Sequence, residues 1–158
     1  MRKLLLVLSV ISIVLMACNS WGDKYMANDK SEVYYKDGAT ADDAKKLGDF
    51  LLKNNYFDSL TEKSVQLTKT VDTFNVKFVV DKEKVNQTEN AEMLFTIMGA
   101  AISADVFSNK PVKVILADQQ MKGFQELPTF TAEAATADTT NTTEPTNTTA
   151  EGDTLHHQ

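Results

Sequence analysis

The sequence has 158 residues, with 16 Lys and Arg against 22 Asp and Glu, and a formal net charge of −6 at pH 7. Arg2 is the only arginine, so the rest of the chain lacks the side chain that binds phosphate and carboxylate in bidentate fashion. Because nucleic-acid binding depends on basic surfaces, we expect no nucleic-acid partner.

The first 17 residues predict a signal peptide. Arg2 and Lys3 give a positively charged start, and residues 4–17 are apolar apart from two serines. As a helix, these fourteen residues would rise roughly 21 Å, which is shorter than the ~30 Å hydrocarbon core of a bilayer. That length favours the apolar region of a cleaved leader. An uncleaved membrane anchor is the alternative.

The leader ends in the tetrapeptide Leu15-Met16-Ala17-Cys18. It resembles the lipobox of bacterial lipoproteins, although Met16 stands where a small residue is usual. The resemblance implies a cut before Cys18 and acyl chains such as palmitate on that residue, which would anchor the protein in a cell-envelope membrane. Asn19 follows instead of the aspartate that resembles an inner-membrane retention signal, which favours the outer membrane. No compact acidic run resembling a surface-export signal follows Cys18, which favours the periplasmic leaflet. An ordinary secretory cut nearby is the alternative.

Composition divides the chain into four parts. Residues 1–17 form the signal peptide, residues 18–31 the lipidated cysteine with a polar tether, and residues 32–127 one small α+β domain. Residues 128–158 are rich in threonine and contain acids but no Lys or Arg, which is typical of a disordered tail. Trp21 of the tether would lie either at the membrane interface or exposed to solvent.

Few residue types that commonly serve in catalysis or metal binding occur in the expected domain. Residues 19–127 contain no histidine, cysteine or arginine, so the usual general base, thiolate nucleophile and zinc ligands are missing there. His156 and His157 lie in the tail, and Asp42-Asp43 is an acidic pair that helix capping already explains. We therefore expect no catalytic, cofactor or metal site.

The domain begins with a strand at residues 32–36 and a helix capped by Thr40, with Asp43 as its capping-box partner and Asn54-Asn55 as its end. Alternating apolar residues predict strands at 64–69 and 74–80, joined as a hairpin.

A second helix is expected at residues 86–107, with Asn86 as N-cap and Glu89 as its capping-box partner. It is apolar nearly all round and is therefore expected to be the more buried helix. Its methionines would fill the core or, alternatively, line an adaptable groove. A last strand is expected at residues 112–117, and residues 118–127 receive no assignment.

The order strand, helix, strand, strand, helix, strand predicts a ferredoxin-like βαββαβ sandwich. Two helices would cover one face of a four-stranded antiparallel sheet of strand order 4-1-3-2, if both crossovers are right-handed. In that order Tyr34, Val79 and Ile115 would form one apolar strip on the uncovered face. The strip predicts a protein partner or self-association, unless the segment Met121 to Leu127 folds over it.

We thus expect a non-enzymatic interaction or accessory lipoprotein. A small-ligand carrier or sensor is the alternative, favoured by any apolar pocket between helices and sheet, and a hydrolase using paired carboxylates is a third reading. Three tripeptides resemble the motif of a bacterial O-glycosylation system, and they would place glycans on Ser59, Thr139 and Thr154.

Overall fold

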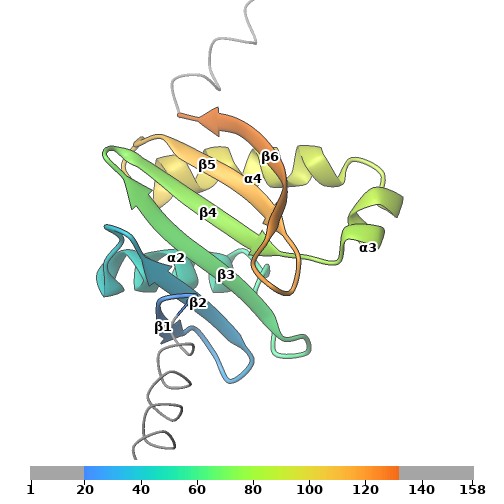
Figure 1. Ribbon diagram of the computed structural model, residues 1–158, viewed down its shortest axis with the longest axis horizontal. Helices are drawn as coiled ribbons and strands as arrows, with labels where there is room; N and C mark the ends of the chain where they lie inside the picture. The colour runs from blue at the N-terminus through green and yellow to red at the C-terminus, as the bar shows by residue number, and fades with distance from the viewer. Residues whose placement is uncertain (1–19, 132–158) are drawn as a thin grey trace, which may run out of the picture.

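A computed structural model describes residues 20–131 and shows a six-stranded sheet with three helices in that part of the chain (Figure 1). The elements are β1 (Asp23–Met26), β2 (Ser31–Lys36), α2 (Ala41–Lys53), β3 (Lys63–Thr70), β4 (Thr73–Val79), α3 (Lys82–Gln87), α4 (Ala91–Asp105), β5 (Val112–Ala117) and β6 (Gly123–Phe130).

The strands lie in the sheet in the same order as in the sequence. They form three antiparallel hairpins, β1–β2, β3–β4 and β5–β6. The hairpins stand edge to edge, so that β2 runs parallel to β3 and β4 runs parallel to β5. Helix α2 connects the first hairpin to the second, and α3 and α4 connect the second to the third.

Helices α2 and α4 cover the same face of the sheet, with α2 near β1 and β2, and α4 near β5 and β6 (Figure 1). The core lies between them and this face, because the alternate strand residues that point there are apolar. Its fully buried members are Val33, Val65, Leu67, Val76, Phe78, Val112, Val114 and Leu116 from the strands and Ala44, Leu47, Leu51 and Ile102 from the helices.

The ferredoxin-like prediction is wrong, and the reason lies in the crossovers. The β2–β3 pair and the β4–β5 pair point in opposite directions, because β3 and β4 are antiparallel. Both connecting helices nevertheless lie on one face of a sheet that advances strand by strand from β1 to β6. The hand of a crossover depends on strand direction, on the direction in which the sheet advances and on the face that the helix covers. Only the strand direction differs between the two crossovers, so they have opposite hands. One of them therefore departs from the right-handed rule on which the order 4-1-3-2 depended.

The sheet also extends past the expected ends of the domain. Strand β1 lies inside residues 18–31, which were expected to be a tether, and pairs along β2. Strand β6 runs from the unassigned residues 118–127 to Phe130, three residues into the expected tail. Both are edge strands with mostly exposed side chains, so their apolar alternation is too weak to predict a strand.

The first helix and four strands are confirmed. The predicted strands correspond to β2, β3, β4 and β5 to within one residue at each end. At α2 the backbone N–H of Asp43 donates to Thr40 Oγ1 at 3.2 Å, and the N–H of Thr40 donates to Asp43 Oδ2 at 3.0 Å. Asn54 is the C-cap, and Asn55 follows with a left-handed φ of 57°.

The second helix is interrupted, so the prediction of one helix from Asn86 is wrong. Asp81 caps α3 by accepting hydrogen bonds from the N–H groups of Glu83 and Lys84, which leaves Asn86 inside α3. The chain then turns through Asn90, whose φ of 62° is left-handed, and α4 begins at Ala91. Asparagine tolerates this conformation better than most residues, which is why the break falls there.

Candidate functional site

Helix α4 carries an exposed apolar surface, contrary to the expectation that it is the more buried helix. Met93, Leu94 and Ile97 are 58%, 59% and 60% exposed, whereas Gly99 and Ile102 are buried against the sheet. We call these three exposed residues the α4 ridge. The helix has no charged side chain between Glu92 and Asp105, so a partner on the ridge would bury no unpaired charge of α4.

A cleft of about 700 Å³ opens beside the ridge, where β4 ends and α3 begins. Leu94 belongs to both the ridge and the wall of the cleft. The other apolar lining residues are Trp21, Tyr56, Val79, Val80, Val85, Ala91, Phe95 and Met121. We call this space the aromatic cleft. Its volume lies within the range of small-ligand sites.

Tyr56 is an aromatic residue in the wall of this cleft. Its ring packs edge-on against Phe78 at 5.1 Å between centroids and against Phe95 at 6.4 Å. Burial raises the pKa of the Tyr56 hydroxyl, so it stays protonated at neutral pH. Lys63 Nζ lies 5.3 Å from the ring centroid and bonds Asp58 Oδ2 at 2.6 Å. The cleft therefore joins an aromatic surface to a charged rim, which also includes Glu62, Asp81 and Lys84.

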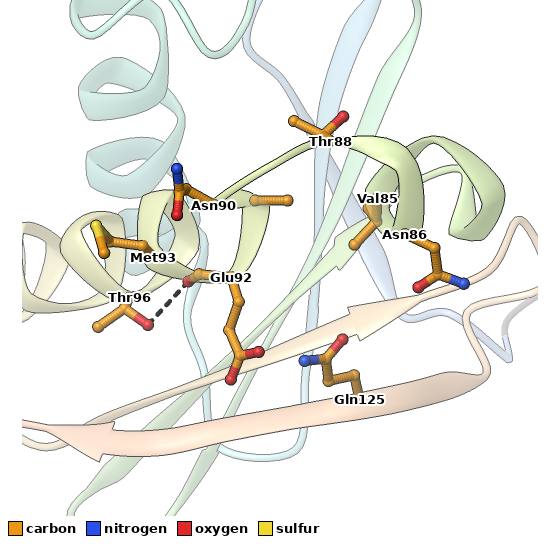
Figure 2. A pocket seen from close by; sticks show the side chains of 9 residues that line it. Val85, Asn86, Thr88, Asn90, Glu92, Met93, Thr96 and Gln125 are labelled. Atoms are coloured by element: carbon orange, nitrogen blue, oxygen red, sulfur yellow. Dashed lines mark hydrogen bonds between the residues drawn. The ribbon is translucent and has the colours of Figure 1, made fainter.

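A second hollow of about 680 Å³ lies between the α3–α4 connection and β6 (Figure 2). It is more polar, since Asn86, Glu92 and Gln125 point toward it (Figure 2). Val85, Thr88 and Ala91 line both hollows. Helix α3 thus separates two spaces and buries none of its own residues, which makes it the least packed element next to the site.

The face opposite the helices, which we call the open face, carries the predicted interface residues. Their side chains belong to transverse rows set by the strand register. One row is Lys24, Tyr34, Gln66, Lys77, Ile115 and Glu126, and the next is Lys36, Thr68, Asn75, Lys113 and Thr129.

The structure does not bring Tyr34, Val79 and Ile115 together as one apolar strip. Tyr34 and Ile115 share a row, but Gln66 and Lys77 lie between them. Val79 stands opposite Ala117 in a different row and lines the aromatic cleft. The expected adjacency depended on the strand order 4-1-3-2. Tyr34, Val79 and Ile115 can still each contact a partner, but they do not form one continuous predicted interface.

Glu32 organises one end of the open face. Its carboxylate accepts hydrogen bonds from Tyr34 Oη at 2.7 Å and Ser64 Oγ at 3.1 Å, and it pairs with Lys24 Nζ at 3.1 Å. Desolvation by burial acts to raise the pKa of Glu32, but these donors outweigh it and the pKa is lowered. Burial, followed by the bond to Glu32, raises the pKa of Tyr34 to about 12. Both groups hold their usual charges at neutral pH.

Other predicted sites are scattered. Ser59 is exposed on the turn after α2, where Asp58 Oδ1 accepts the N–H groups of Leu60 and Thr61. Asp43 is used in capping, and Asp42 pairs with Lys46 at 2.6 Å. The remaining predicted positions, Cys18, Thr139, Thr154, His156 and His157, lie outside the described residues.

The alternative of a groove lined by methionines anticipated the α4 ridge only through Met93, and sequence reasoning missed the rest of the ridge and the aromatic cleft. The apolar residues of α4 are evident in the sequence. Which of them are exposed depends on the side of the helix that packs against the sheet. Within residues 20–131, no helix is long and apolar enough to cross a membrane. The same residues hold no cluster of three or more metal-ligating side chains.

Comparison with known proteins identifies a family. Residues 24–128 match the model of the AF_1994_N family, described as a family N-terminal domain. The chain belongs to this family. The matched residues begin in β1 and end in β6, so they agree with the observed sheet and not with a domain starting at residue 32. No curated protein and no solved structure matches the chain.

Proposed function

We propose that the protein is a bacterial lipoprotein whose folded domain is a non-enzymatic binding module. The N-terminal residues support the anchor: a basic start, a short apolar run and Cys18 at the end of a lipobox-like tetrapeptide. The mature chain would begin at Cys18 and be held by its acyl chains in the periplasmic leaflet of the outer membrane. We assign it no catalytic residue and no cofactor.

The α4 ridge is the observation that carries the binding role. Three large apolar side chains, each more than half exposed, lie within two turns of one helix. Single exposed apolar residues are common, whereas a cluster next to a cleft is typical of an interface. The partner is a protein or a second copy of the chain.

Site-specific photocrosslinking in the native envelope tests this role. A photoreactive residue at Ile97 is expected to give a crosslinked product of defined mass, and twice the mass of the chain would identify self-association. Val71 is a matched control, because it is 86% exposed and apolar but lies in the β3–β4 turn. No product from Ile97, or the same products from both positions, would contradict the proposal.

A second candidate function is the carriage of a small amphipathic ligand, and the aromatic cleft favours it. The cleft is large enough for such a ligand, and the Tyr56 ring lies in its wall. A fluorescent fatty acid is expected to bind the full chain and to be displaced when Leu94→Trp fills the cleft. Val71→Trp is the control. Equal binding by the two variants would remove the carrier function.

A further inference from the structure

The N-terminal segment, Ser20 and Trp21, lies on the open face just before β1 begins. Lys36 Nζ donates to the carbonyl oxygen of Ser20 at 3.0 Å, and Gln66 Nε2 donates to that of Trp21 at 2.9 Å. The Trp21 ring meets Tyr34 edge-on, with 5.3 Å between centroids and an interplanar angle of 84°. Lys36, Gln66 and Tyr34 all belong to the open face, so the N-terminal segment is fixed there.

Little chain separates this segment from the proposed anchor. Cys18 precedes Trp21 by three residues, and an extended chain covers at most about 3.6 Å per residue, so their Cα atoms lie within roughly 11 Å of each other. The expected tether of residues 18–31 is therefore much shorter, since docking begins at Ser20 and β1 at Asp23. Acyl chains on Cys18 would hold the open face close to the bilayer surface.

The chemistry of the open face suits phospholipid headgroups. Its two rows contain four lysines and one glutamate, and Glu32 lies opposite Ser64 in the neighbouring row. This face is therefore basic although the whole chain has a net charge of −6. Lys24 pairs with Glu32, and Lys113 pairs with Glu126. Tyr34 and Trp21 add the amphipathic rings that favour a membrane interface.

Lys36 and Lys77 are the lysines of this face that are not held by a close carboxylate, since the pair of Lys36 with Asp37 is long and Lys77 forms no ion pair within the described residues. They line a hollow of about 280 Å³ together with Thr68, Asn75 and Asp37, and Asp37 lies 3.8 Å from Lys36 Nζ. Lys77 Nζ donates to the carbonyl oxygen of Met121 at 3.0 Å and has no carboxylate partner within residues 20–131. Burial, followed by the charge of Lys36, lowers the pKa of Lys77. An anion placed between the two amines would relieve that repulsion.

We infer that the open face is a membrane-docking surface, in which Lys36 and Lys77 receive the phosphate groups of phospholipid headgroups and Trp21 and Tyr34 lie at the interface. The inference rests on the proposed lipid anchor at Cys18. Because α4 covers the opposite face of the sheet, docking in this way directs the α4 ridge away from the bilayer. The protein would then hold one face on lipid and present the other to its partner.

Cysteine accessibility tests this orientation in the lipidated full chain, reconstituted in vesicles of phosphatidylethanolamine and phosphatidylglycerol. The only native cysteine is the acylated Cys18, so an introduced cysteine is a clean reporter. Asn75→Cys reports on the open face, and Lys45→Cys reports on the outer side of α2. We expect a membrane-impermeant maleimide to react at least tenfold more slowly at position 75 in vesicles than in detergent. The rate at position 45 is expected to change less than twofold.

The lysines are tested in the same assay. Lys36→Gln with Lys77→Gln is expected to restore most of the labelling at position 75, whereas the control pair Lys46→Gln with Lys53→Gln on α2 is not. Equal protection at positions 75 and 45, or no effect of the Lys36 and Lys77 changes, overturns the docking surface. If high salt extracts the protein from the vesicles, the proposed anchor has failed. This outcome is distinct from a failure of the docking surface.

Discussion

The carbonyl oxygen of Trp21 accepts a 2.9 Å hydrogen bond from Nε2 of Gln66, which lies 45 residues further along the chain. Gln66 is only 4% exposed although it belongs to the face without helices. The N-terminal segment is what covers it. This bond therefore connects the position of the proposed anchor to the centre of the sheet.

Gln66→Leu is expected to release Trp21 from the open face. The substitution leaves the Trp21 carbonyl without its donor, and the loss of such a bond costs about 1 kcal/mol of unfolding free energy. Trp21 is the only tryptophan, so its fluorescence reports on the change directly. Acrylamide quenching is expected to increase while the circular dichroism of the fold is retained. Thr68→Val, two residues along the same face of β3, serves as control. Unchanged quenching in Gln66→Leu would mean that the segment is held by other contacts.

Gly99→Ala is expected to destabilise the domain. A Cβ at this position would lie 2.8 Å from Cγ2 of Val114 and would meet the ring of Phe130. Such overpacking costs about 1–3 kcal/mol, which exceeds the gain of ~1 kcal/mol in helix propensity. We expect a melting temperature lower by several degrees, and partial recovery when Phe130→Leu is added. A higher melting temperature for Gly99→Ala would show that α4 does not pack closely on β5 and β6.

The turn after α2 is expected to lose stability in acid. The hydrogen bond from Lys63, with those from the N–H groups of Thr61 and Leu60, lowers the pKa of Asp58 to about 2 from an ordinary value of 3.8. A lowered pKa in the folded state adds stability above the unfolded value, and this contribution is lost as pH falls from 3.8 towards 2. The melting temperature of Asp58→Asn is therefore expected to lie below that of the parent at pH 6 and to converge with it near pH 2. A difference in melting temperature that stays constant across this range would contradict the assignment.

Glycans are expected at Ser59, Thr139 and Thr154 if the tripeptide resemblance holds. Ser59 is exposed, and its neighbour Leu60 is 85% exposed, so an enzyme can reach this site without unfolding the domain. Intact mass spectrometry of the native protein is the measurement, with Ser59→Ala as the matched variant. A mass accounted for by polypeptide and acyl chains alone would exclude glycosylation.

Local patterns predicted the elements well and their arrangement poorly. The Thr40 and Asp43 capping box and the alternation in β4 depend on neighbouring residues, and the structure confirms both. The order of the strands depends on the hand of each crossover, which no local pattern contains. Strands β1 and β6 lie at sheet edges and have few buried side chains, so they gave little signal.

The candidate site was unpredictable for a related reason. The apolar residues of α4 are visible in the sequence, but the sheet decides which of them are covered. Gly99 lets the helix approach Phe130 and Val114, which leaves Met93, Leu94 and Ile97 on the outer side. Likewise, a lysine such as Lys77 is an ordinary surface residue until the strand register places it near Lys36.

Metabolic labelling with palmitate tests the lipoprotein proposal most directly. The full chain is expected to incorporate the label and to stay in the membrane fraction after a high-salt wash. Cys18→Ala is expected to lose the label and to appear in the soluble fraction in greater amount. A Cys18→Ala protein that still resists the wash, or a parent chain that takes up no palmitate, would contradict the account.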